Sequence, residues 1–259
     1  MPIASLARRA VKAAALPAGL VTRRRPDDLV ILLYHRIGDG GGEIELPETA
    51  FERHLRYLRT RERVVTLDQA LADGAGGIVV TFDDGYLDFY DRVVPLLVKH
   101  EVPALLYLAT GLVANGAARA EQLTWSHLRE AVATGWVTVG SHTHDHVNLA
   151  EATEVLATAE MRRSKEMIED KLGSACRHFA YPWAVASPDS DRVARVLFES
   201  AALDAWKTNR RGRTDPHRLG RTPILASDGR VFFRAKVKGA LDGEALFYRA
   251  LQRGPWRFR

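Results

Sequence analysis

Two adjacent aspartates and a group of histidines are the residues of this 259-residue chain whose types and spacing could do chemistry. Asp83 and Asp84 directly follow the apolar run 78–82, which has the length of a buried strand. His142 and His146 are four residues apart, so a single helical turn or a tight loop would direct both imidazoles the same way. Together with one carboxylate they would form a His₂Asp site with an open coordination position, as catalytic zinc sites do.

The aspartate pair allows two carboxylates to have different functions. Neighbouring side chains of a strand point in different directions, so one aspartate can bind a metal while the other stays free as a base. Gly85 permits the sharp turn that follows. A divalent metal would lower the pKa of its bound water to roughly 7 and so provide a nucleophile at neutral pH.

Other apolar runs also end in polar or aromatic residues. Tyr34 and His35 end the run that begins at residue 29, and Pro182 and Trp183 follow the run 179–181. We expect His35 to be either a catalytic group or a buried core histidine. Trp183 is a candidate platform on which a sugar could stack.

Five other histidines are predicted to have no part in the site. His144 lies between the two proposed ligands and should point away from them. His54, His100 and His127 fall on predicted helices and are expected at the surface, whereas His217 falls in a loop and is expected to be structural.

The elements that must position these residues alternate regularly along the chain. Runs of strand length occur at 29–34, 78–82, 103–108, 136–139, 179–181 and 201–206, with a last strand around Ile224. Helical patterns occur at 48–59, around 93–98, and at 125–133, 151–172, 189–199 and 229–240. This alternation predicts a parallel sheet wrapped by helices, and at this length a closed barrel is the economical arrangement. The carboxyl ends of the strands, and the motifs that follow them, should then meet at one face.

Charge and composition restrict the class of protein. The net charge of +5 comes from two basic ends, because residues 26–248 hold 27 bases and 32 acids. We therefore predict no nucleic-acid partner, since such a protein needs a basic stripe on its folded body. Ordinary hydrophobic content excludes a wholly disordered chain. The lone Cys176 excludes an internal disulfide.

The basic N-terminal segment, residues 1–26, is predicted to be separate from the catalytic domain at 27–259. Arg8 and Arg9 before an apolar stretch are faintly similar to a twin-arginine signal, but Lys12 and Pro17 interrupt it. We favour an uncleaved amphipathic segment, loosely ordered or lying on a membrane surface or anionic polymer. A cytoplasmic and an envelope-associated location both remain open.

Three motifs resemble those of a known family. The sequence from Thr81 to Gly85 reads TFDDG, HTxxH begins at His142, and FAYPW begins at Phe179. These resemble the first three motifs of the NodB-homology polysaccharide deacetylases (carbohydrate esterase family four), and the resemblance extends over most of 29–240. It implies an α/β fold, an irregular (β/α)₇ barrel in a single domain. It also implies metal-dependent hydrolysis of N-acetyl groups on amino-sugar polymers, sometimes of O-acetyl esters.

The resemblance assigns roles to individual residues. Asp83 would be the general base, and Asp84, His142 and His146 would bind a divalent metal, most simply Zn²⁺. The general acid in the branch that includes poly-N-acetylglucosamine deacetylases comes from an N-terminal Tyr-His, which makes His35 the expected acid. A backbone N–H near the residues Tyr181, Pro182 and Trp183 would stabilise the oxyanion.

Two departures from the family pattern concern the third motif. An arginine that orients the base aspartate is common in that motif, and Ala180 stands at the matching position. Trp183 and Ala184 replace the usual aromatic-glycine pair. We predict that Arg221 supplies the missing guanidinium.

The predicted function is removal of N-acetyl groups from an amino-sugar polysaccharide or oligosaccharide. Two alternatives differ from it: deacylation of a smaller acetylated glycoside or glycolipid, and sugar binding by a barrel without catalysis. The intact aspartate pair and both histidines argue against the second alternative. The sequence identifies neither the substrate and its length nor the metal and the oligomeric state.

Overall fold

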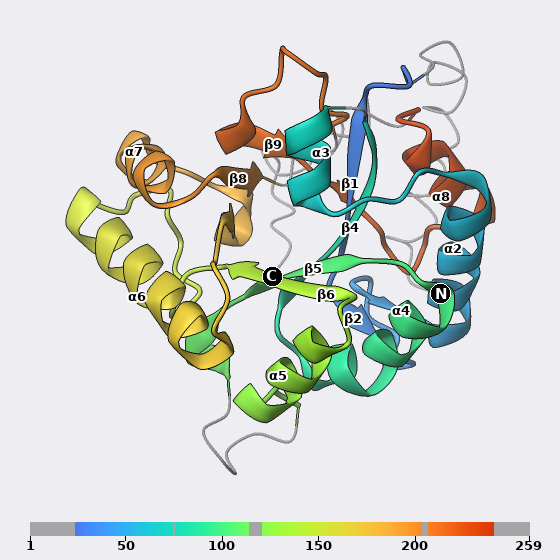
Figure 1. The fold of residues 1–259 in the computed structure, drawn as a ribbon, viewed down its shortest axis with the longest axis horizontal. Coiled ribbons are helices and arrows are strands. Elements are labelled where there is room, and N and C mark those ends of the chain that lie inside the picture. The colour runs from blue at the N-terminus through green and yellow to red at the C-terminus, as the bar shows by residue number, and fades with distance from the viewer. Residues whose placement is uncertain (1–23, 75, 114–120, 204–206, 241–259) are drawn as a thin grey trace, which may run out of the picture.

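The structure is a computed structural model, and it describes residues 24–74, 76–113, 121–203 and 207–240. Strands and helices alternate along this part of the chain, and the strands lie inside a surround of helices (Figure 1). Residues 1–23 of the predicted N-terminal segment 1–26 lie outside the described residues. Trp206, at the end of the predicted strand 201–206, also lies outside them. Contact of the N-terminal segment with a membrane or an anionic polymer therefore stays a prediction.

Six parallel strands form the wall of the fold. They lie side by side in the order β1 (Leu29–Tyr34), β4 (Gly77–Asp84), β5 (Ala104–Leu108), β6 (Val137–Ser141), β7 (His178–Ala180) and β8 (Ser200–Leu203). The side chains of β1 and β5 are buried along their whole length, because one strand face points into the sheet's interior and the other packs under helices. The apolar runs of the sequence correspond to these strands.

One short segment closes the sheet. β9 (Leu219–Gly220) pairs with β8 through Ala202 and Leu219, and β10 (Thr222–Pro223) pairs with β1 through Leu32 and Thr222. The two strands are halves of one extended stretch that is interrupted only at Arg221. Counted once, this stretch is the seventh strand, and the predicted (β/α)₇ barrel in a single α/β domain is confirmed.

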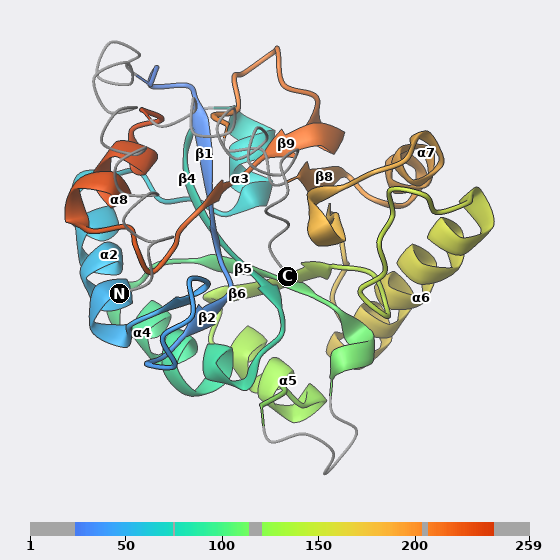
Figure 2. The ribbon, with the colours of Figure 1, turned by 180° about the vertical axis from the view of Figure 1, so that it is seen from behind.

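The helices pack around the outside of the barrel (Figures 1 and 2). They are α2 (Glu48–Arg61), α3 (Leu67–Asp73), α4 (Val94–His100), α5 (Trp125–Ala133), α6 (Glu154–Leu172), α7 (Pro188–Leu197) and α8 (Arg230–Val237). A π-helical turn, Phe89–Val93, precedes α4, and a two-stranded ladder of β2 (Arg36–Ile37) and β3 (Glu45–Leu46) follows β1. The predicted helices are all present, with ends displaced by a few residues.

Local capping explains where several helices begin and end. The side chain of Thr153 accepts a hydrogen bond from the backbone of Leu156 at the start of α6. Gly173 ends that helix in the left-handed conformation, as its place in the sequence predicts. The short helix α3 was not predicted, although Thr66 and Gln69 form a complete capping box at its start.

The prediction that His54 lies at the surface is wrong. Its side chain is 5% exposed and lies between α2 and α8, stacked on Phe233 with ring centroids 3.6 Å apart. The Tyr34 hydroxyl is within hydrogen-bond distance of its Nδ1, at 3.2 Å. His54 lies on the same face of α2 as Phe51 and Leu58, which form the buried stripe of the helix. Burial, aided by the charge of Arg53 and opposed by Asp228, lowers the pKa of His54 to about 3.

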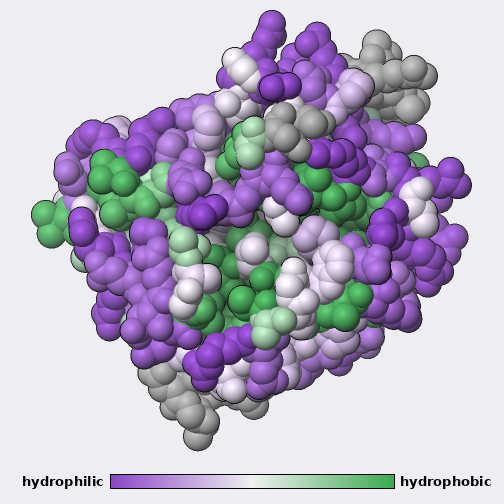
Figure 3. Space-filling view, viewed as in Figure 1, coloured by the Kyte–Doolittle hydropathy of each residue, from purple (hydrophilic) through white to green (hydrophobic). Residues whose placement is uncertain are grey.

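Most of the molecular surface in the view of Figure 3 is hydrophilic. Exposed apolar side chains include Val155 and Leu156 at the start of α6 and Val196 on α7. Among the described residues, no helix has the length and apolar character needed to cross a lipid bilayer.

Candidate active site

The predicted site residues come from the carboxyl ends of three strands and from the loops that follow them. Asp83 and Asp84 end β4, His142 directly follows β6, and His35 directly follows β1. Because all barrel strands are parallel, these ends meet at one face of the barrel. The loop after His142 returns His146 to the same place.

Asp84, His142 and His146 form a group that could hold a metal ion. One potential ligand atom from each residue lies within 4.8 Å of the others. The Nε2 atom of His146 is 3.3 Å from Asp84 Oδ1, and that of His142 is 3.7 Å from the same oxygen. Two imidazoles and one carboxylate that converge on one position provide three ligands. Such a donor set leaves a coordination position open, as in catalytic metal sites.

Hydrogen bonding and burial prepare His142 to be a ligand. Its Nδ1 lies 2.8 Å from the carbonyl oxygen of Ala180, so this nitrogen carries the proton and Nε2 faces the carboxylates. Burial lowers the pKa of His142, against the opposing charges of Asp83 and Asp84. The imidazole is therefore neutral near pH 7, as metal binding requires.

Asp83 is held by a buried guanidinium. Arg221 donates from Nη1 to Oδ1 at 2.6 Å and from Nη2 to Oδ2 at 2.8 Å, and both side chains are almost completely buried. Burial alone would raise the pKa of Asp83, but the charges of Arg221 and His142 outweigh it and hold the pKa below its ordinary value. Tyr107 lies under the guanidinium, 5.3 Å from ring centroid to Cζ. The carboxylate is thus charged and fixed in orientation.

Asp84 turns away from its neighbour because the backbone bends at this residue. Its φ of 74° lies in the left-handed region, and Gly85 follows with φ of 103°. Hydrogen bonding to His146 and the charges of His142 and His35 lower the pKa of Asp84 against the effect of burial. Burial and the nearby charge of Asp84 raise the pKa of Tyr86, a neighbour of the site that the sequence motifs did not indicate.

His35 is near enough to both aspartates for its charge to act on them. The side chain is half-buried, and its charge contributes to lowering the pKa of Asp83 and of Asp84. Its neighbour Tyr34 points into the core and packs on Phe51 and Phe82. The two residues of the Tyr-His pair thus lie on opposite faces of the strand end.

The turn of Tyr181, Pro182 and Trp183 lies at the edge of the histidine pair. The Tyr181 hydroxyl donates to Asp191 at 3.4 Å and its backbone N–H donates to the Ala202 carbonyl, so Tyr181 belongs to the core. Trp183 is 66% exposed, has φ of 58°, and its ring lies 5.1 Å from that of His146. Of the three residues, Trp183 is the one placed to meet a ligand.

Two other histidines are held away from this group. His144 points to the opposite side of its loop, where its Nδ1 lies 2.8 Å from Thr110 Oγ1. The Nε2 of His217 lies 2.8 Å from the Phe198 carbonyl oxygen and fixes a turn.

The fold and the site together indicate a class of protein. A parallel barrel with a His₂Asp group that could hold a metal ion at the carboxyl ends of its strands, beside a separate arginine-held carboxylate, is typical of hydrolases. Residues 72–197 match the family of polysaccharide deacetylases. The chain therefore carries a polysaccharide deacetylase domain of the NodB-homology family.

Individual relatives agree with this family. The chain is 26% identical over 170 residues to YxkH of Bacillus subtilis, whose name places it among polysaccharide deacetylases; the match covers 62% of this chain and 59% of YxkH. It is 23% identical over 158 residues to the poly-beta-1,6-N-acetyl-D-glucosamine N-deacetylase of Staphylococcus aureus, covering 55% and 54% of the two chains. This chain thus aligns with somewhat more than half the length of these curated relatives.

A solved structure shows the same architecture. IcaB from Ammonifex degensii superimposes with a TM-score of 0.71 at 28% sequence identity, covering 85% of this chain and 99% of that one. The likeness therefore extends over more of the chain than the family match at 72–197.

Proposed function

We propose that this protein is a metal-dependent deacetylase that removes N-acetyl groups from an amino-sugar polymer or oligomer. One observation carries the proposal: a potential metal triad of Asp84, His142 and His146 lies directly beside a second carboxylate, Asp83, that is not part of it. Hydrolysis of an amide needs both an electrophile for the carbonyl and a base for water, and this arrangement provides both.

The donor set favours Zn²⁺ as the metal. Two neutral imidazole nitrogens and one carboxylate oxygen suit zinc in a site that leaves room for substrate. A divalent ion bound there would act as a Lewis acid that polarises the acetyl carbonyl and makes water acidic. Asp84 is the carboxylate ligand in this proposal, because its Oδ1 lies 3.3 Å from Nε2 of His146, whereas both oxygens of Asp83 accept hydrogen bonds from Arg221.

Asp83 is the general base in this proposal. Its two oxygens accept from Arg221, and the Oδ2 atom also lies 3.7 Å from Nε2 of His142, so the carboxylate is at the edge of the metal group. A carboxylate fixed in this way can take a proton from water without reorienting. Arg221 is thus a positioning residue that replaces the arginine missing at Ala180.

His35 and Trp183 complete the reaction. Protonated His35, close to the carboxylates, would give its proton to the departing amine when the tetrahedral intermediate collapses. The backbone N–H of Trp183 is the candidate oxyanion donor, because the N–H of Tyr181 already donates to Ala202 and Pro182 has none. The exposed indole of Trp183 offers a surface on which a sugar ring can stack.

The comparisons support a polymer of N-acetylglucosamine as the first substrate to test. The S. aureus relative is named for action on poly-beta-1,6-N-acetyl-D-glucosamine. The proposed acid, His35, directly follows Tyr34 near the N-terminus. The sequence resemblance associates such a Tyr-His pair with the branch that includes poly-N-acetylglucosamine deacetylases.

The test is a screen for amine release by the zinc-loaded protein. It should include oligomers of poly-N-acetylglucosamine and of chitin, peptidoglycan fragments, and acetylated xylan for ester cleavage, with Asp83→Asn as the inactive control. We expect release from at least one N-acetylated oligomer and none from the control. Release from small acetylated glycosides alone would support the smaller-substrate alternative. Metal binding without turnover on any substrate would support a sugar-binding protein without catalysis.

A further inference from the structure

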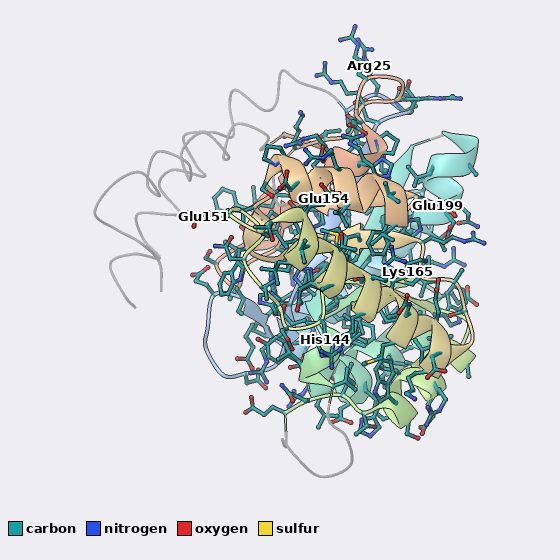
Figure 4. The ribbon with its side chains drawn as sticks, turned by 90° about the vertical axis from the view of Figure 1, so that its left-hand side faces the viewer. Arg25, His144, Glu151, Glu154, Lys165 and Glu199 are labelled. Atoms are coloured by element: carbon teal, nitrogen blue, oxygen red, sulfur yellow. The ribbon has the colours of Figure 1, made fainter. Side chains whose placement is uncertain are left out.

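Helix α6 presents two buried polar side chains toward the loop that holds the metal histidines. Glu160 is 8% exposed and Ser164, four residues later on the same face, is completely buried. Figure 4 shows α6 crossing the molecule, with His144 of the loop labelled close to it. Neither α6 residue belongs to the motifs or to the metal group.

The Glu160 carboxylate accepts hydrogen bonds from the backbone of that loop. Its Oε2 takes the N–H of His144 at 3.1 Å and the N–H of Asp145 at 2.8 Å. Among the residues that the structure describes, it forms no ion pair. A buried carboxylate is costly unless its charge is satisfied, so these two charge-assisted bonds are what retain it in this position.

The loop held by Glu160 has an unfavourable backbone conformation. Thr143 has φ of 66° and His146 has φ of 53°, both in the left-handed region that residues with a Cβ avoid. The far side of the loop is bound to the 3₁₀ turn Thr110–Leu112 that follows β5, where the Gly111 N–H donates to the His144 carbonyl at 2.7 Å. Such a conformation persists only while contacts on both sides maintain it.

Ser164 supports the start of the same loop. Ser141 donates to Ser164 Oγ at 3.0 Å, and the Thr143 N–H donates to Ser141 Oγ at 3.3 Å. His142 has its own anchor in the Ala180 carbonyl. Among the described residues, the polar contact of the His146 ring is with Asp84, whose Oδ1 lies 3.3 Å from His146 Nε2. The direction of the His146 imidazole therefore depends on the backbone of the preceding residues.

We propose that Glu160 is a positioning residue of the metal site, which fixes the loop between the two histidines and thereby the direction of His146. The inference rests on the proposed function in so far as the histidines bind a metal. Loss of the carboxylate would leave the N–H groups of His144 and Asp145 without their acceptor, and the loop would relax toward ordinary backbone angles. His146 would then move away from Asp84, and the affinity for the metal would fall.

Zinc affinity, measured by competition with a chromogenic chelator, tests the inference without relying on activity. Glu160→Ala removes the acceptor. Glu160→Asp keeps a carboxylate, but its side chain is shorter by one methylene group, so the oxygens lie farther from the N–H groups of His144 and Asp145. We expect both to raise the zinc dissociation constant 10–100-fold, roughly the range typical of residues that orient metal ligands. Glu160→Gln keeps an acceptor oxygen and should stay within about threefold of wild type. Glu166→Gln, at an exposed position of the same helix, should change nothing.

The outcomes separate this inference from the proposed function. If wild type binds no divalent metal, the proposed function fails. If wild type binds zinc and the Asp and Ala variants bind it equally well, Glu160 is not a positioning residue. Should Glu160→Ala not fold, the Asp variant decides, with circular dichroism and melting temperature showing that it is folded. Equal losses in the Asp and Gln variants would also overturn the inference, because a shared loss would not depend on the acceptor.

Discussion

At the scale of single residues, the contact between Asp83 and Arg221 is the one on which the proposed chemistry depends most. The two residues are 138 positions apart in sequence, and both guanidinium nitrogens contact the carboxylate. Ala180 leaves no arginine in the third motif, and Arg221 on the closing stretch of the barrel contacts Asp83 from another part of the chain. The orienting role proposed for Arg221 rests on this contact.

Replacement of Arg221 should therefore affect both catalysis and stability. In Arg221→Ala the buried Asp83 charge loses its partner, which should cost about 3–5 kcal/mol of unfolding free energy. We expect turnover to fall at least about 100-fold, because the base is no longer held in place. Arg221→Lys should recover part of the stability but little turnover, since an ammonium cannot bind both oxygens. Urea unfolding and steady-state kinetics measure the two effects, and full activity in Arg221→Ala would remove the residue from the mechanism.

The two aspartates should separate metal binding from proton transfer. Asp83→Asn retains all three proposed ligands, so we expect zinc content near that of wild type and a loss of turnover of about 10²–10⁴-fold. His142→Ala removes a ligand and should lose both the metal and the activity. Zinc content by atomic spectroscopy and amine release are measured on the same samples. Equal zinc loss in the two variants would show that this division between the aspartates is wrong.

At the scale of elements, the sequence indicates strands and helices well where the pattern is local. The apolar runs of β1 and β4 and the cap at Gly173 are examples, since each depends on neighbouring residues only. The short elements α3, β2 and β3 give too few periods to be recognised. The closing stretch was expected around Ile224, but pairing occurs at 219–223 because each half meets a different strand.

The same distinction applies to the site. Asp83, Asp84, His142 and His146 could be recognised because their spacing is visible along the chain. Tyr86 and Glu160 could not, because their proximity to the site depends on how the chain folds around it. His54 was misplaced for a related reason: its partner Phe233 belongs to a helix that meets α2 only in the folded barrel.

The packing of α2 against α8 predicts a pH dependence of stability. The pKa of His54 is about 3 in the folded protein, against an ordinary value of 6.5. Above pH 6.5 both folded and unfolded states hold a neutral imidazole, and the contribution to stability is complete. As the pH falls from 6.5 toward 3, only the unfolded state takes up the proton, so stability is lost. At pH 5 this loss should reach up to about 2 kcal/mol.

His54→Gln provides the comparison, since an amide can still hydrogen-bond the Tyr34 hydroxyl but does not titrate. Unfolding free energies of both proteins at pH 7.5 and pH 5 should show a smaller pH effect in the variant. Identical pH effects would mean that His54 is charged in the fold or not buried as described.

At the scale of the whole molecule, one stretch of chain both closes the barrel and contributes a residue to the candidate site. Arg221 lies between β9 and β10, so the stretch that joins the two edges of the sheet also delivers the guanidinium to Asp83. Along the sequence, the excess positive charge belongs to the two ends of the chain, outside the segments that carry the motifs. The body, with its excess of acids, contains the residues proposed to bind metal and move protons.

The central claim is that amide hydrolysis at this site requires the bound metal. The most direct measurement is amine release from poly-N-acetylglucosamine oligomers by protein that has been stripped with a chelator and then titrated with Zn²⁺. We predict that the stripped protein is inactive and that activity returns in proportion to zinc, saturating near one ion per chain. Full activity of the stripped protein would contradict the claim.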